Sequence, residues 1–282
     1  MTQLSRTAAV RRPGAPTTGV VPGRRMGERA RGRVSQILVV MAAVLLWHVF
    51  SLSDMAGKAN MPAPLETAGR FLELLPTAEF WTTIGSTMLS WCTALLLSLV
   101  IGIPVGMGLG RHRVAGQSSR FVVDFLRTIP SLAIIPLALL LLGPNYAMVV
   151  MVAAFTAVWP VLIQSMYAAE NADPSLGLVG RSYRLTRQDR IRYILAPQFL
   201  AFFWPGLRMA VTASLLVAVG AELIGGAPGI GSAIQNSLLF NEQVTMFAYV
   251  LAAAGIGLGI NSVLMLLQRK LLWWHASMRK AG

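Results

Sequence analysis

The residue types that carry chemistry are few in this chain, and most of them lie far apart. Of its 282 residues, 11 are Asp or Glu, three are His and one is Cys. The histidines His48, His112 and His275 fall in separate regions, and Cys92 lies inside an apolar run. This spacing disfavours a histidine-built zinc site, and it excludes an internal disulfide and a cysteine-rich metal site. We therefore expect no catalytic residue, no cofactor and no metal ligand here.

Motifs for nucleotide binding and hydrolysis are also missing from the sequence. Gly57-Lys58 is followed by Ala and lacks the loop that cradles a phosphate, and Gly106-x-Gly108-x-Gly110 lies in an apolar run with no strand before it. Neither a Gly-x-Ser-x-Gly elbow nor an HExxH helix occurs. An enzyme acting within a membrane would need a catalytic pair inside apolar runs, and none is found. We predict that the chain is not an enzyme.

One carboxylate is chemically informative because of where it lies. Glu222 ends an apolar run and precedes a glycine-rich stretch that includes Gly229 and Gly231. A carboxylate in a membrane is energetically expensive and is a functional candidate by default. The alternative is a capped residue at the outer membrane interface. We predict that Glu222 anchors the glycine turn at an outer gate, by accepting hydrogen bonds from backbone N–H groups.

The elements that must position these residues are apolar runs of membrane-spanning length. The chain is 55% hydrophobic and 12% charged, whereas about a quarter of an ordinary soluble domain is charged. Each run is near the ~20 residues that cross a bilayer, and backbone in hydrocarbon must be helical at this length. The predicted spans are about 35–52, 82–110, 121–142, 146–168, 206–225 and 244–267. We predict an all-α integral membrane protein with about six transmembrane helices. The first run is interpreted as an uncleaved span rather than a signal peptide, because no clean cleavage site follows it.

The distribution of Arg and Lys predicts the orientation of these spans. With the N-terminus inside, the inner segments hold 22 of the 24 basic residues, and only Lys58 and Arg70 lie outside. Basic residues collect on the cytosolic side of membrane proteins. Both termini are therefore predicted to be cytosolic, with 1–34 a disordered basic tail and 35–282 the transmembrane domain. The net charge of +13 is then explained by the orientation of the spans in the lipid bilayer. We therefore expect no nucleic-acid partner.

The predicted spans contain regularly spaced glycines and several prolines. Gly102, Gly106 and Gly110 lie four residues apart, as do Gly255 and Gly259. Such spacing lets two helices approach closely, either as plain packing or at a subunit or gate interface. Prolines that bend helices fall within or at the ends of spans. They are Pro104, Pro130, Pro136 and Pro160.

The inside segment 170–204 is predicted to be a hairpin of two short helices. Asp173-Pro174 is a helix start, Thr186 with Asp189 resembles a capping box, and Pro197 is expected to end the second helix. Leu176, Val179 and Tyr183 form one apolar stripe among arginines. This surface is interpreted as a docking site for a partner. The alternative is a hairpin lying on the inner leaflet.

Several segments, taken in order, resemble the permease subunit of bacterial ABC importers, in the branch that handles sulfonates, taurine, nitrate and related small solutes. They are Met61-Pro62-Ala63-Pro64, Arg127 to Leu137 followed by Gly143, the loop from 170 through Pro197 to Arg208, Ala221-Glu222 with Gly229-Ile230-Gly231, and Gln268 to Trp274. The resemblance covers about 60–275. One departure lies in the cytosolic loop, where Leu178, Val179 and Gly180 replace the usual Glu-Ala-Ala and Arg184 replaces the usual glycine.

This resemblance implies a transport path for a small, anionic solute, with ATP bound by a separate cytosolic ATPase subunit. It also implies an extracytoplasmic solute-binding protein, a homodimer of the permease, and a bacterial cell membrane. The residues expected to couple to the ATPase are Leu176, Leu178, Val179, Gly180, Tyr183 and Arg184. Those expected to act at a gate or in its structure are Glu222, Gly229, Gly231, Pro130 and Pro136. The alternative class is a secondary transporter, which should place ionisable residues at the membrane midplane.

Overall fold

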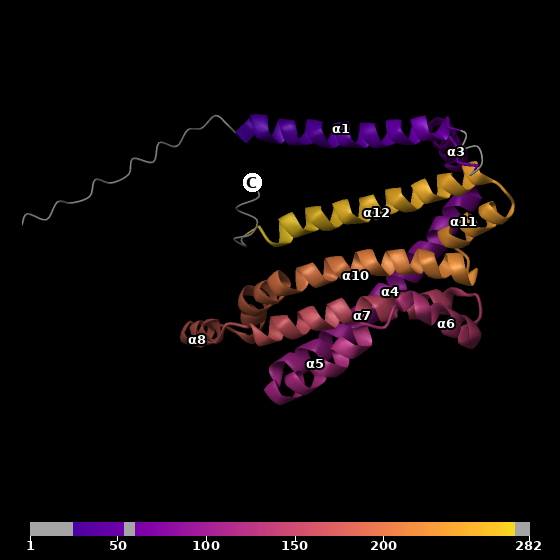
Figure 1. The fold of residues 1–282 in the computed structure, drawn as a ribbon. Coiled ribbons are helices and arrows are strands. Elements are labelled where there is room, and N and C mark those ends of the chain that lie inside the picture. The colour runs from indigo at the N-terminus through magenta and orange to yellow at the C-terminus, as the bar shows by residue number, and fades with distance from the viewer. Residues whose placement is uncertain (1–24, 54–59, 274–282) are drawn as a thin grey trace, which may run out of the picture. The chain divides into compact units, whose positions relative to one another are not determined.

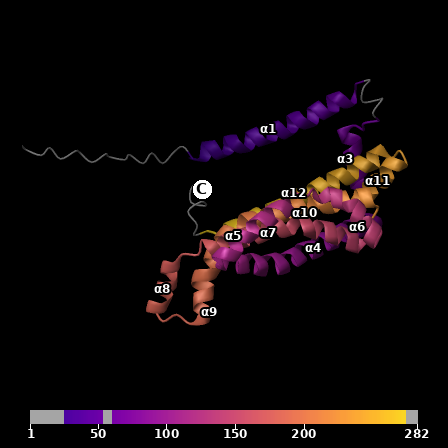
Figure 2. The ribbon, with the colours of Figure 1, turned by 60° about the horizontal axis from the view of Figure 1, so that its bottom comes forward.

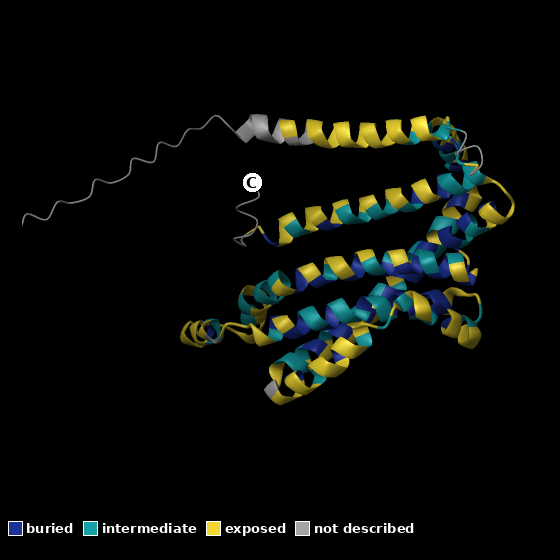
Figure 3. Cartoon of the chain, in the orientation of Figure 1, coloured by how far each residue is buried: buried dark blue, intermediate teal, exposed yellow. Residues whose placement is uncertain are grey.

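The computed structural model describes residues 25–53 and 60–273, and it divides the chain into two units, residues 1–50 and 51–282. The first unit is a single helix, α1 (Arg25–Ser51), which begins ten residues before the predicted span. Nearly all of its described side chains are exposed, although its residues 34–51 are strongly apolar (Figure 3). An apolar helix of this length is suited to lipid. Residues 1–24 of the predicted tail lie outside the described residues.

The second unit is entirely helical over its described residues, which agrees with the predicted fold class (Figure 1). Its long apolar helices are α4 (Ala78–Arg111), α7 (Tyr146–Glu170), α10 (Ala196–Gly225) and α12 (Gln243–Leu271). Two shorter helices accompany them, α3 (Pro64–Leu74) and α11 (Ile230–Leu239). Each long helix coincides with a predicted span. Together with α1 they are the five described helices that are long and apolar enough to cross a membrane.

The predicted third span is bent at Pro130, one of the prolines expected to bend the spans. Helix α5 (Arg113–Arg127) is followed by a 3-10 turn, η1 (Ser131–Ile134), and by α6 (Ile135–Leu142). The two halves meet at 71° and together make a sixth candidate crossing. The break lies at Pro130, which has no N–H to donate and which disfavours helical backbone at Ile129 before it. Pro136 does not interrupt α6, because it occupies the first turn, where no N–H donor is needed.

Helix α7 lies between α4 and α10 and carries most of the core. The predicted close approach is confirmed for Gly102, Gly106 and Gly110, which face α7 so tightly that an added methyl would overlap with it. Two hydrogen bonds support this packing, because Trp91 donates to the Val211 carbonyl at 3.2 Å and Ser98 donates to the Ala154 carbonyl at 3.0 Å. The second glycine pair differs: no described atom lies within 4 Å of a methyl placed on Gly255 or Gly259.

The predicted hairpin is present as α8 (Pro174–Ser182) and α9 (Arg187–Arg190), which extend away from the bundle (Figure 2). Its end was predicted wrongly. Instead of stopping at Pro197, the second arm continues through a π-helical segment, η2 (Ile191–Leu195), into α10. The wider π turn satisfies the carbonyl of Ile191 through Ala196 N–H. Pro197 then falls in the first turn of α10, where its missing N–H costs little.

Candidate functional site

Glu222 lies at a junction of three helices. Its side chain is fully buried, and its Oε2 accepts hydrogen bonds from the Thr87 hydroxyl of α4 at 2.8 Å and from the backbone N–H of Gly231 at 3.0 Å. The Thr87 oxygen in turn accepts from Ile230 N–H at 2.8 Å. Residues 230 and 231 open α11, and a negative group is stabilised there by unpaired N–H groups and the helix dipole. Glu222 therefore caps α11 from α10, in addition to the local bond that Gly229 N–H donates to the Ser232 hydroxyl at 3.1 Å.

Two glycines make this junction sterically feasible. A methyl on Gly229 would overlap with the Glu222 carboxyl group, and one on Gly231 would come within 2.5 Å of the Leu223 backbone nitrogen. Only backbone without a side chain can lie so close to α10. Glu222 Oε1 has no hydrogen-bond donor among the described residues. The carboxyl group is thus held on one side only, at a place where burial is expensive.

A polar cavity of about 490 Å³ lies beside this junction, between α3, α4, α11 and α12. Gly229 and Ser232 belong both to its wall and to the start of α11. Apolar residues such as Leu74 and Phe240 share the remaining lining with hydroxyl and amide groups. These polar groups include Thr82, Thr83, Ser86, Asn236, Ser237 and Thr245. The charged groups of the wall are Arg70, Glu79 and Glu242. Such a cavity can hold a small hydrated or polar solute at the end of the bundle that carries the glycine turn.

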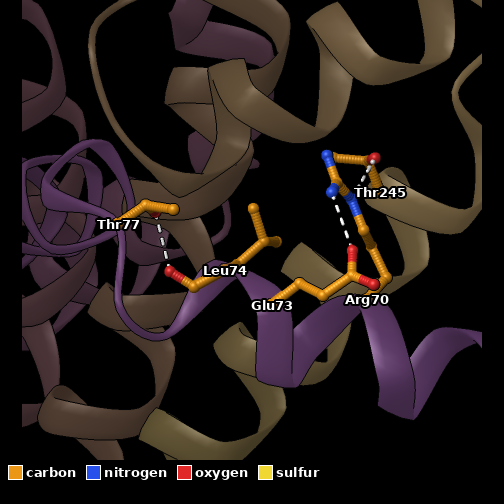
Figure 4. Close-up of polar contacts among 5 residues, drawn as sticks. All are labelled: Arg70, Glu73, Leu74, Thr77 and Thr245. Atoms are coloured by element: carbon orange, nitrogen blue, oxygen red, sulfur yellow. Dashed lines mark hydrogen bonds and ion pairs between the residues drawn. The ribbon is translucent and has the colours of Figure 1, made fainter.

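Arg70 joins two walls of the cavity (Figure 4). Its Nε donates to the Thr245 hydroxyl of α12 at 3.1 Å, and its Nη1 lies 3.0 Å from the Glu73 carboxylate one turn along α3. The same short helix buries Leu74 against α12, and Thr77 closes the helix end by donating to the Leu74 carbonyl at 2.7 Å. Helix α3 is thereby fixed over the cavity.

The residues of the hairpin that were predicted to contact a partner differ in solvent exposure. Leu178, Val179 and Tyr183 are exposed, with 63%, 44% and 77% of their surfaces accessible, whereas Leu176 is only partly exposed. Gly180 is buried, because Ile194 of the second arm packs across it. The exposed apolar surface of the first arm is therefore formed by Leu178, Val179 and Tyr183, so it differs from the predicted stripe in having Leu178 in place of Leu176.

Both predicted helix starts of the hairpin are confirmed. Asp173 accepts from Ser175 N–H at 2.8 Å, and Thr186 accepts from Asp189 N–H at 3.2 Å. The hydrogen bonds from Ser175 hold the pKa of the exposed Asp173 carboxyl group below its ordinary value. These caps order an arm that is otherwise largely exposed.

The first arm of the hairpin ends at Arg184. Its φ of +50° places it in the left-handed region. Its N–H donates to the Arg181 carbonyl, and Leu185 N–H donates to the Gly180 carbonyl, which together make a Schellman turn. The position where a glycine was expected from the resemblance is thus one where glycine is physically preferred.

The predicted gate residues are only partly brought together. Gly229 and Gly231 contact Glu222, whereas Pro130 and Pro136 flank the bend between α5 and α6 and take no part in the junction. Thr87 was missed from the sequence. It lies 135 residues from Glu222 along the chain, and a threonine inside an apolar helix usually bonds only to its own backbone. No signal in the sequence distinguishes it from neighbouring threonines.

Comparisons with known proteins agree with this helical arrangement. Residues 98–272 match the family model described as "Binding-protein-dependent transport system inner membrane component". The chain is 29% identical over 272 residues to the bicarbonate transport system permease protein CmpB of Synechococcus elongatus, covering 88% of this chain and 96% of that protein. It is 25% identical to the putative aliphatic sulfonates transport permease protein SsuC of Bacillus subtilis, with 89% and 91% covered.

Two further matches extend the picture. The chain is 26% identical over 184 residues to the nitrate import permease protein NrtB of Leptolyngbya laminosa, covering 65% of this chain and 66% of that protein. Among solved structures, a chain of the MetNI methionine ABC transporter matches with a TM-score of 0.57 at 15% identity, covering 68% of this chain and 96% of that one. At this identity the structural match establishes a shared fold.

Proposed function

Because the chain belongs to the family of binding-protein-dependent transport system inner membrane components, we propose that it is the transmembrane subunit of an ATP-driven importer in a bacterial cell membrane. The family is a membrane transport component rather than an enzyme. A separate cytosolic ATPase supplies the energy in this proposal, and an extracytoplasmic binding protein delivers the solute. Two copies of the permease enclose the path between them.

The proposed solute is a small anion. The relatives are named for bicarbonate, aliphatic sulfonates and nitrate, which share small size and a negative charge. The outer cavity supports passage of such a solute, because its wall is rich in hydroxyl and amide donors and includes Arg70. Glu79 and Glu242 line the same cavity, so the wall alone does not select anions. Selection among anions belongs in this proposal to the binding protein.

The proposed coupling element is the hairpin. Leu178, Val179 and Tyr183 form an exposed apolar patch on an arm that two helix caps hold in place, and Arg184 is exposed at its tip. An exposed apolar patch beside basic groups is suited to a protein partner. On the orientation predicted from Arg and Lys, this partner is the cytosolic ATPase.

One observation carries the proposal that the Glu222 junction acts as an outer gate. A single buried carboxylate ties α10 to α4 and to the start of α11, and α11 forms part of the cavity wall. When any of these three helices moves, either the hydrogen bonds of Glu222 must break or the other two helices must move with it. The junction can therefore link the shape of the outer cavity to the positions of the spans.

Transport in proteoliposomes tests this role. Glu222→Gln keeps the shape of the side chain, but it removes the charge and turns one oxygen into a donor. We expect the uptake rate to fall at least about tenfold, since charge-assisted hydrogen bonds are roughly twice as strong as neutral ones, while the amount of protein in the membrane stays near the wild-type level. Glu66→Gln, on the outer surface of α3, is the matched control and should transport normally. Full uptake by the Glu222 variant would contradict the gate.

The predicted orientation has its own test. Single cysteines are placed at Lys58 and at Arg187 in a Cys92→Ala background and treated with a reagent that does not cross the membrane. We expect labelling at 58 from outside intact cells and labelling at 187 only after permeabilisation. Labelling of both positions from outside would overturn the six-span orientation.

A further inference from the structure

A second cavity, of about 700 Å³, lies at the other end of the bundle. Its floor is apolar and is built from the ends of α4 and α7 and the start of α10, with Met107, Ala168, Leu195 and Phe199 among its residues. Cavities of about 300–1,000 Å³ hold ligands of drug size. A bare inorganic anion would need neither this volume nor an apolar floor.

Three arginines border this cavity: Arg111 ends α4, and Arg187 and Arg190 lie on α9. No carboxylate lines the cavity, and none of the three forms an ion pair with a described residue. The acids close to these arginines or to the lining in sequence have other partners: Asp189 is bonded to Thr186, Glu170 pairs with Arg120, and Asp173 accepts from Ser175 N–H. Three like charges around one cavity repel one another, so an anion bound among them would be stabilised.

Arg190 is held in place by packing rather than by a charge partner. Its stem and guanidinium group lie across the bare face that Gly177 and Gly180 leave on α8, at distances close enough that methyl groups there would touch it. Its Nε is buried and has no hydrogen-bond acceptor among the described residues. A guanidinium group fixed in this way, with its Nε donor unused, is suited to a phosphate, which such a group can bind through two parallel hydrogen bonds.

From this arrangement we infer that the cavity is a binding site for an anionic phospholipid, with its phosphate on Arg111, Arg187 and Arg190 and an acyl chain on the apolar floor. The position supports this occupant. The site lies where apolar helices end, on the side that holds 22 of the 24 basic residues. Basic pockets between helices on that side of a membrane are suited to lipid head groups, and the cytoplasmic leaflet is the anionic one. The hairpin is thereby connected to the membrane as well as to a protein partner.

Binding of defined lipids to the full chain in neutral detergent tests this site. The probes are dioleoyl phosphatidylglycerol, dioleoyl phosphatidylcholine and inorganic phosphate, and bound lipid is counted by native mass spectrometry alongside the thermal unfolding midpoint. We expect saturable binding of phosphatidylglycerol that phosphatidylcholine and inorganic phosphate do not displace. Displacement by millimolar inorganic phosphate would overturn the lipid assignment in favour of a free-anion site.

A matched pair of variants separates a built site from general surface attraction. Arg187→Gln with Arg190→Gln should raise the dissociation constant for phosphatidylglycerol at least about tenfold, as expected for the loss of two charge-assisted contacts. Arg184→Gln with Arg192→Gln removes the same charge from the same hairpin but outside the cavity lining, and should change it less than about threefold. Equal losses in the two double variants would overturn the inference.

A third variant keeps every charge. Ala172→Phe adds bulk at the cavity wall and should weaken phosphatidylglycerol binding while leaving the far-ultraviolet circular dichroism unchanged. Undiminished lipid binding in this variant would contradict an acyl chain in the cavity. None of these measurements involves transport or ATP, so their failure would leave the proposed importer function standing.

Discussion

Thr87 and Glu222 are the buried hydroxyl and carboxyl groups that connect the second and fifth predicted spans, through a hydrogen bond of 2.8 Å. Thr87 serves two partners at once, since its oxygen also accepts from Ile230 N–H. Loss of this one hydroxyl would therefore leave a carboxylate with a single donor and a backbone N–H with no acceptor. A buried polar group without a partner costs about 1–3 kcal/mol.

Thr87→Val removes the hydroxyl with little change in shape. We expect the free energy of unfolding to fall by about 2 kcal/mol, because both the Glu222 carboxylate and Ile230 N–H lose a partner. Thermal unfolding in detergent measures the loss. Thr212→Val is the matched control, because the Thr212 hydroxyl is exposed and bonds only to the Arg208 carbonyl of its own helix. An equal effect at the two threonines would contradict a special role for Thr87.

Gly231→Ala adds one methyl where α11 meets α10. The methyl would overlap with the Val219 carbonyl and the Glu222 Cβ, so we expect a loss of about 1–3 kcal/mol, as is usual for overpacking. Gly108→Ala serves as the control, because no described atom lies within 4 Å of its added methyl. That substitution should be neutral or stabilising by about 0.5–1 kcal/mol. A Gly231 variant as stable as the Gly108 variant would show that the helices are not in close contact.

Arg184→Gly relieves a strained backbone. Glycine adopts a φ near +50° without the steric penalty that a side chain brings, so the hairpin turn should gain about 1 kcal/mol. Hydrogen exchange at the amides of Arg181, Ser182 and Leu185 should slow by about fivefold, which corresponds to that energy. A β-branched residue such as Val at the same position should speed exchange instead. Unchanged exchange in both variants would mean that the left-handed turn carries no strain.

A second substitution at Arg184 tests binding of the ATPase rather than the stability of the turn. Arg184→Glu keeps a side chain but reverses its charge, and it should abolish co-purification of the ATPase if the arginine pairs with a partner carboxylate, since breaking a desolvated charge pair costs roughly 2–5 kcal/mol. Val179→Asp should do the same by charging the apolar patch, while both proteins still insert into the membrane. Wild-type recovery of the ATPase with both variants would remove the hairpin as the coupling element.

Arg70→Gln tests whether α3 is held to α12 over the cavity of about 490 Å³. Losing the bond to Thr245 should loosen α3 and speed hydrogen exchange there several-fold. Glu73→Gln should have much less effect, because its ion pair with Arg70 is exposed and such pairs contribute about 0–1 kcal/mol. A Glu73 effect equal to the Arg70 effect would assign the attachment to the ion pair rather than to Thr245.

Periodicity and length were enough to predict the helical class, the five long helices and both hairpin caps, since these depend on local patterns. The bend at Pro130 agrees with the expectation that the prolines bend the spans. The end of the hairpin was predicted wrongly, because a π turn accommodates Pro197 and the helix continues. Thr87 was beyond prediction, because its role exists only when α4, α10 and α11 meet. The exposed face of α8 likewise depended on how α9 packs against it.

The π-helical segment between the hairpin and α10 also has a mechanical consequence. Segment η2 and Pro197 interrupt the regular hydrogen-bond ladder at the place where the hairpin departs from the axis of α10 (Figure 2). Irregular turns and prolines are where helices bend most readily. The segment therefore acts as a flexible joint. Because the helix is continuous, a movement of the hairpin can be transmitted to α10, and because the segment is irregular, it can bend and reduce that movement. In the proposed function, the stiffness of this joint sets how much of a movement of the hairpin reaches Glu222, near the far end of α10.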